Sequence, residues 1–87
     1  MPMTADHDQS PQALVLERVD PARRMARFYV LSIEPTLFDD VSLMRNWGRI
    51  GTCGRRRVEL HPTQNAARIA LEKWLQRKRR RGYRVRA

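Results

Sequence analysis

The hexapeptide Trp47-Gly48-Arg49-Ile50-Gly51-Thr52 lies near the middle of the 87-residue chain. On a β-strand, side-chain alternation divides this segment between two faces, with Arg45, Trp47 and Arg49 on one and Met44, Gly48 and Ile50 on the other. The first face would present an aromatic ring between two guanidinium groups, which suits stacking on a base and binding of phosphates. A half-buried tryptophan beside two solvated arginines explains the same residues equally well.

The charge distribution favours the first interpretation. The chain has 18 Lys+Arg against 9 Asp+Glu, and 16 of the 18 are arginine. Residues 1–44 carry a net charge of −3, whereas residues 45–87 carry +12. A positive field of this size accelerates association with polyanions, and arginine favours bidentate phosphate contacts. Composition alone does not separate DNA from RNA or from an acidic protein.

The chain is short enough for a single domain, which we place at residues 13–87. Residues 1–12 mix polar residues and proline, so we expect a disordered leader rather than a signal peptide. No segment reaches the ~20 apolar residues of a membrane span. The single cysteine, Cys53, excludes an internal disulfide and a four-cysteine zinc site, and it fits a cytoplasmic protein.

Apolar and β-branched runs predict four strands, and a short fifth is expected after the helix. The ranges are 13–19, 25–34, 43–50, 56–60 and 83–86. Thr63 is the expected N-cap of a long helix and Gly82 its stop signal. The 3.6-residue spacing of Ala67, Ala70, Leu71, Trp74, Leu75 and Lys78 predicts one buried stripe, with Trp74 in the core. The expected fold is α+β: a four- or five-stranded antiparallel sheet packed by one long C-terminal helix.

The turn Gly51–Gly54 predicts a hairpin between the third and fourth strands. A five-residue loop, 51–55, would place Arg57 opposite Arg49 and Glu59 opposite Trp47. This register would put Gly48, Ile50, Val58 and Leu60 on the helix-facing side. Like charges that face each other across the ladder repel, so a bound anion would reduce the repulsion between Arg49 and Arg57.

Catalysis has little support in the sequence. Only His7 and His61 are histidines, and neither stands in a nucleophile–base pattern. Asp39 and Asp40 are adjacent, so their side chains diverge on an extended loop. Glycine loops of the P-loop or dinucleotide type are absent. We therefore expect no enzymatic activity, no catalytic residue, no metal site and no cofactor.

The run Arg77-Lys78-Arg79-Arg80-Arg81 has two explanations. It extends a nucleic-acid surface, or it places cations at the negative end of the helix dipole. Tyr83 is expected to pack the sheet against the helix.

The motif, together with Gly54, Ala67, Leu71, Leu75, Lys78 and Gly82-Tyr83, resembles the WGR domain family. That family shows W-G-R-[IV]-G-x-x-G, then a helix with A-x3-F-x3-F-x2-K, then G-Y. The spacing matches at every step over about residues 14–83. Two departures are Arg55, where glutamine is frequent, and leucines at 71 and 75 in place of phenylalanines.

The resemblance implies an antiparallel sheet with a helix. In DNA-dependent poly(ADP-ribose) polymerases the WGR module contacts DNA near a strand break and relays binding to the catalytic region. By motif position, Trp47 would stack on the terminal nucleotide, and Arg49 would contact phosphate or another domain. The length leaves no room for a catalytic domain, so the chain is similar to a stand-alone bacterial version.

Two functions follow as hypotheses. The first is a small non-catalytic protein that binds nucleic acid, with DNA ends or nicks as the refinement from the resemblance and RNA as an alternative. The second is a module that binds an acidic protein partner, since Trp and Arg are also frequent interface hot spots. The candidate binding residues are Arg45, Trp47, Gly48, Arg49, Arg55, Arg57, Lys78, Arg79 and Arg80. The sequence leaves the oligomeric state open.

Overall fold

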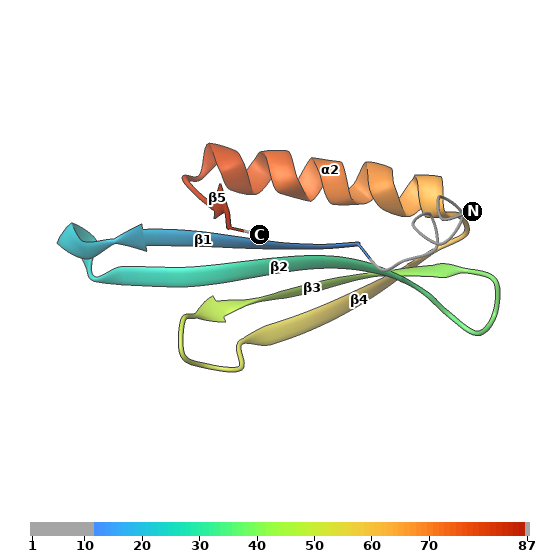
Figure 1. Ribbon diagram of the computed structural model, residues 1–87, viewed down its shortest axis with the longest axis horizontal. Coiled ribbons are helices and arrows are strands. Elements are labelled where there is room, and N and C mark those ends of the chain that lie inside the picture. The colour runs from blue at the N-terminus through green and yellow to red at the C-terminus, as the bar shows by residue number, and fades with distance from the viewer. Residues whose placement is uncertain (1–11, 87) are drawn as a thin grey trace, which may run out of the picture.

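The computed structural model describes residues 12–86, which form one sheet and one long helix (Figure 1). The elements are β1 (Gln12–Asp20), η1 (Pro21–Arg23), β2 (Met25–Pro35), β3 (Val41–Arg49), β4 (Arg55–His61), α2 (Gln64–Arg80) and β5 (Arg84–Val85). The strands pair antiparallel in the order β4-β3-β2-β1-β5. The expected α+β fold is confirmed, including the short fifth strand. The predicted leader lies outside the described residues except for Gln12, which begins β1.

β2 is the central strand because it is apolar on both faces. On the face of β2 that packs against α2, every second side chain is nearly inaccessible to solvent: these are Tyr29, Leu31 and Ile33. Leu16 on β1 and Leu43 on β3 lie beside them in the same layer, and both are fully buried. Removing this much apolar side chain from water is the main driving force for closing the helix onto the sheet.

α2 begins and ends where its sequence predicts. The Thr63 side chain accepts a hydrogen bond from the Ala66 amide at 3.0 Å, as an N-cap does. Ala67, Leu71 and Leu75 are buried, while Trp74 and Lys78 lie half-buried on the same stripe. The helix ends before Gly82, whose φ of +97° favours glycine. Tyr83 is then buried against the core.

The assignment of the two faces of β3 is the reverse of the expected one. α2 covers the face that carries Leu43, Arg45 and Trp47, so Arg45 is only 7% exposed. The opposite face, which includes Val58 and Leu60 of β4, has no helix over it, and these two side chains are 51% and 63% exposed. The expectation that Gly48, Ile50, Val58 and Leu60 face the helix is therefore wrong.

The hairpin register also differs from the five-residue loop. The last pair across it is Trp47 with Arg55, so Arg57 lies opposite Arg45 and Glu59 opposite Leu43. The predicted pairs of Arg57 with Arg49 and of Glu59 with Trp47 are wrong. Ile50 lies beyond the end of β3, yet its amide still donates to the Ala26 carbonyl at 3.0 Å.

Gly54 explains why the loop is longer than expected. Its φ is +71°, and a Cβ there would lie 2.3 Å from the Trp47 carbonyl oxygen and 2.7 Å from the Phe28 ring. The backbone at Gly48 is equally crowded, because a Cβ on it would lie 2.7 Å from the Gly54 Cα. The loop residues 50–54 thus fold back onto the end of β3 through a close approach between Gly48 and Gly54.

A pair of glycine variants tests this packing. Gly51→Ala changes a residue with φ of +95° and no neighbour within 4 Å, so it should cost about 1–2 kcal/mol from backbone strain alone. Gly54→Ala adds a steric clash to the same strain and should cost at least about 3 kcal/mol in total. Urea unfolding of both variants measures the difference. Equal losses would contradict the proposed close approach.

Candidate nucleic-acid interface

Arg45 is a buried cation in the layer between the sheet and α2. Its guanidinium carbon lies 3.9 Å from the centroid of the Trp74 ring and 5.4 Å from that of Trp47. Nη1 donates to the Tyr29 hydroxyl at 3.2 Å, and Nη2 lies 3.5 Å from the Glu59 carboxylate. The guanidinium therefore connects two strands and the helix, and it is not free to contact a ligand.

Four aromatic rings gather around this cation. Tyr29 stacks with Trp47 at a centroid distance of 5.9 Å and with Trp74 at 6.4 Å, while Tyr83 meets it edge-on at 6.1 Å. Trp47 and Trp74 are both half-buried. The expectation of a buried Trp74 and an outward-facing Trp47 is therefore replaced by two rings in similar surroundings, packed into one aromatic cluster.

Lys78 places a second cation at the aromatic cluster. Its Nζ lies 4.5 Å from the Tyr29 ring centroid and 5.5 Å from that of Tyr83. Burial lowers the pKa of Lys78, and the positive charge of Arg81 lowers it further, as do Arg45, Arg77 and Arg27 in decreasing order. Within residues 12–86, no carboxylate lies within ion-pair distance of Lys78. Burial also raises the pKa of the Tyr29 hydroxyl, although its hydrogen bond with Arg45 opposes that shift.

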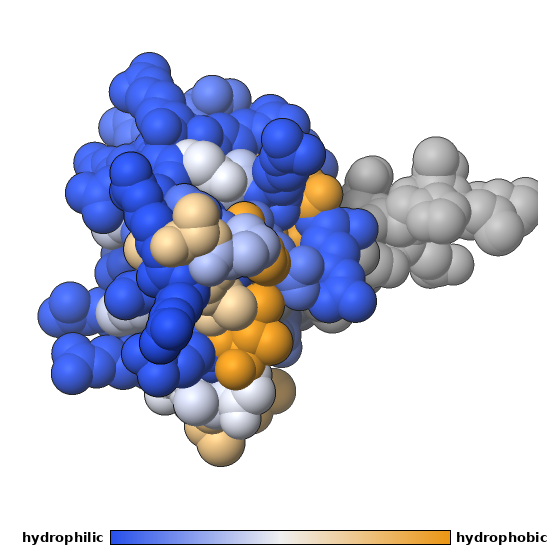
Figure 2. All heavy atoms as spheres, turned by 90° about the vertical axis from the view of Figure 1, so that its left-hand side faces the viewer, coloured by the Kyte–Doolittle hydropathy of each residue, from blue (hydrophilic) through white to orange (hydrophobic). Residues whose placement is uncertain are grey.

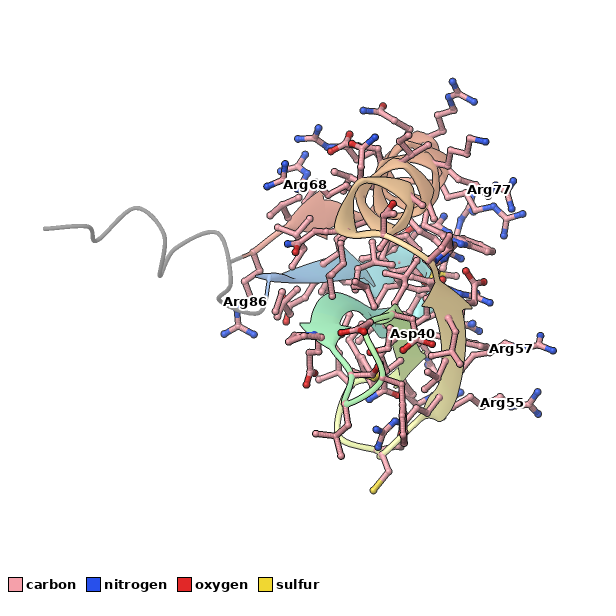
Figure 3. All side chains as sticks on the ribbon, turned by 90° about the vertical axis from the view of Figure 1, so that its right-hand side faces the viewer. Asp40, Arg55, Arg57, Arg68, Arg77 and Arg86 are labelled. Carbon is pink, nitrogen blue, oxygen red and sulfur yellow. The ribbon has the colours of Figure 1, made fainter. Side chains whose placement is uncertain are left out.

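Three exposed arginines extend from the same side of the molecule (Figure 3). Arg55 and Arg57 project from β4 on the same face of the sheet as Trp47 and Arg45. Across the ladder, Arg55 is paired with Trp47 and Arg57 with Arg45. Arg77 comes from α2, and its guanidinium lies 4.7 Å from the Trp74 ring. We call Arg55, Arg57 and Arg77, together with the exposed parts of Trp47 and Trp74, the basic flank.

The other residues expected at the site occupy several different positions. Gly48 lies on the opposite face of β3 and serves the hairpin. Arg49 is exposed at the end of β3, beside Arg27. At 100° per residue, Arg79 faces the side of α2 that carries Arg68, which Figure 3 shows pointing away from Arg77. Arg80 follows Arg77 by three residues and lines the same depression on α2, so it adjoins the basic flank. The predicted run of Lys78, Arg79 and Arg80 is therefore not one surface.

Sequence reasoning missed Tyr29 and Glu59 as parts of the site, and it named Arg77 only within the basic run at the helix end. In the sequence, Tyr29 has the pattern of an ordinary core residue of an apolar strand. Glu59 comes near Arg45 only in the observed pairing of β3 with β4. A usable signal existed for Arg77, which follows Trp74 by three residues and therefore lies on its side of the helix.

Two further observations limit the chemistry of the described part of the chain. Residues 12–86 hold no group of three or more metal-ligating side chains. No helix among them is both long and apolar enough to cross a membrane.

The match to known families covers almost the whole chain. Residues 12–87 match the WGR domain. The chain belongs to the WGR domain family. The WGR domain is a nucleic-acid-binding module in proteins related to poly(ADP-ribose) polymerases, and by itself it is not catalytic.

A protein of Sinorhizobium fredii, described only as uncharacterised, is 51% identical over 77 residues. The match covers 87% of this WGR chain and 37% of that relative. The chain thus spans little more than a third of the length of the curated relative it matches. No solved structure gives a significant match.

The lowered pKa of Lys78 gives a prediction for pH. Because its folded pKa is below the unfolded value of 10.5, the unfolded chain binds more protons between the two values, and stability should rise with pH across that window. NMR titration of the Lys78 side chain should show the shift, and Arg81→Gln should move the pKa back upward. Arg68→Gln, on the other side of α2, should leave it unchanged. An unshifted Lys78 in the parent protein would contradict this account.

Proposed function

We propose that this chain binds nucleic acid, with DNA as the preferred ligand, through the basic flank. The observation that carries the proposal is the excess of cations around the aromatic cluster. Of the arginines and Lys78 gathered there, only Arg45 has a carboxylate at ion-pair distance within residues 12–86. A polyanion would supply the negative charge that this surface lacks, and each phosphate contact would release condensed counterions.

The geometry supports a backbone-binding surface with adjacent stacking rings. Arg55 and Arg57 are residues i and i+2 of β4, about 6.6 Å apart, so they project in one row from the same face of the sheet. Trp47 lies across the ladder from Arg55, so its exposed part borders the same surface. Arg45 acts beneath them by holding the rings of Trp47 and Trp74 in place.

Salt dependence tests the electrostatic part of the proposal. With one phosphate engaged by each of Arg55, Arg57 and Arg77, the slope of log K against log salt should be about −2.7, since each contributes about 0.9. Arg55→Gln/Arg57→Gln should reduce the magnitude of the slope by about 1.8 by the same relation. The matched control is Arg68→Gln/Arg79→Gln, which removes the same charge from the other side of α2 and should leave the slope near that of the parent.

Two results would contradict the proposal that the basic flank binds nucleic acid. Equal effects of both pairs of variants would mean that net charge, not this surface, determines binding. No binding to duplex DNA, single-stranded DNA or RNA at low salt would remove the proposed function and leave the acidic protein partner as the better explanation.

Trp47 variants test stacking separately from charge. Trp47→Ala should weaken binding by about 1–3 kcal/mol and leave the salt slope unchanged. Trp47→Phe keeps a ring and should retain most of the affinity, while circular dichroism checks that both variants fold. If the chain recognises DNA ends, Trp47→Ala should also abolish any preference for nicked or linear duplex over closed circular DNA. A folded Trp47→Ala that binds like the parent would make this ring purely structural.

A further inference from the structure

The two ends of the long axis carry opposite charges. The described fold is elongated, with extents of 48 × 27 × 23 Å. The loop between β2 and β3 lies at one end, and η1 and the loop between β3 and β4 lie at the other (Figure 1). The basic flank starts next to the second end, because Arg55 directly follows the loop between β3 and β4.

The first end, which we call the acidic tip, comprises residues 36–40. Leu37 and Phe38 are 94% and 83% exposed, and Asp39 and Asp40 follow them. Within residues 12–86, neither carboxylate has an arginine or lysine at ion-pair distance. Two adjacent large apolar side chains almost fully in water are an unfavourable arrangement unless they serve an interface.

The acidic tip is a structured turn. The Thr36 amide donates to the Asp40 carbonyl at 3.1 Å, and the Phe38 amide donates to the Thr36 hydroxyl at 3.1 Å. The Thr36 hydroxyl also donates to the Asp40 carboxylate. These bonds fix the backbone before any partner arrives, so binding through the tip would cost little ordering entropy.

The second end has a cavity of about 170 Å³. We call it the arginine pocket; its lining is Arg23, Arg24, Met25, Ala26, Arg27 and Arg49. Arg23 pairs with Asp20 at 3.6 Å, and the other three arginines have no carboxylate at ion-pair distance within the described residues. Arg24 has a φ of +53°, an unfavourable conformation for a residue with a side chain.

Apolar surface adjoins the arginine pocket. Val19 is 59% exposed and Ile50 is 42% exposed, and they flank the η1 turn and the β3 end that line it. Figure 2 shows this end of the molecule, where a strip of apolar side chains is bordered by hydrophilic ones. The arginine pocket therefore offers cations and apolar contacts together, which is the complement of the acidic tip.

We propose that the acidic tip of one copy docks at the arginine pocket of a second copy. The carboxylates of Asp39 and Asp40 would meet the unpaired arginines, and Leu37 and Phe38 would cover Val19 and Ile50. A second copy is the occupant because this chain itself carries both complementary surfaces. Because the two surfaces differ and lie at opposite ends, the contact is head-to-tail and leaves a free surface at each end, so it builds open chains.

Sedimentation of the full chain without nucleic acid tests the proposal. At low salt, the weight-average mass should rise with concentration past the dimer, up to about 1 mM, because an interface under about 1,200 Å² holds only a weak complex. Leu37→Ser/Phe38→Ser and Arg24→Gln/Arg49→Gln should each remain monomeric. Arg68→Gln/Arg79→Gln loses the same charge as the second variant and should still assemble.

Mixing the two monomeric variants distinguishes this contact from other modes of association. Each variant retains one intact surface, so an equimolar mixture should form dimers and nothing larger. A parent protein that stays monomeric, or that stops at a dimer, would overturn the head-to-tail contact. So would a mixture without dimers. If Arg24→Gln/Arg49→Gln lowers duplex affinity while the parent stays monomeric, the arginine pocket binds phosphate instead.

Discussion

The burial of one guanidinium, that of Arg45, determines how the rest of the structure is arranged. Taking a charge out of water is expensive unless it is paired and hydrogen-bonded. Here two indole rings, the Tyr29 hydroxyl and the Glu59 carboxylate offset that cost. These partners come from β2, β3, β4 and α2, so the guanidinium has all of them only when the four elements are in place. One side chain thereby links the helix to the apolar face of the sheet that it covers.

The same arrangement explains why the neighbourhood is short of negative charge. Glu59 faces Arg45 and also lies 3.4 Å from His61, so its carboxylate is shared inside the cluster. Within residues 12–86, Glu59 is the one carboxylate at ion-pair distance from this group of cations, and it is already engaged. The lowered pKa of Lys78 is caused first by burial and then by the positive charges of Arg81, Arg45, Arg77 and Arg27. An external anion at this site would offset part of that repulsion.

Much of the fold could be predicted from the sequence because its signals are local. The Thr63 cap, the Gly82 stop and the stripe of α2 depend on a few consecutive residues, and the structure confirms all three. The covered face of β3 could not be predicted this way, because Arg45 counts as polar in any pattern and is buried largely through Trp74 and Tyr29, which are distant in sequence. The predicted register of the hairpin between β3 and β4 was wrong for a similar reason. It depends on the approach of Gly48 to Gly54, a contact that loop length alone does not predict.

The surfaces proposed for nucleic acid and for self-association consist of different residues, and this has a physical consequence. The basic flank runs along the side of the fold, whereas the acidic tip and the arginine pocket lie at its two ends. Copies joined end to end would therefore bring several flanks together in one assembly. Contacts that are individually weak then reinforce each other, since a neighbour already bound raises the effective concentration of the next copy. A small domain with few phosphate contacts would gain length-dependent affinity in this way without any larger binding site.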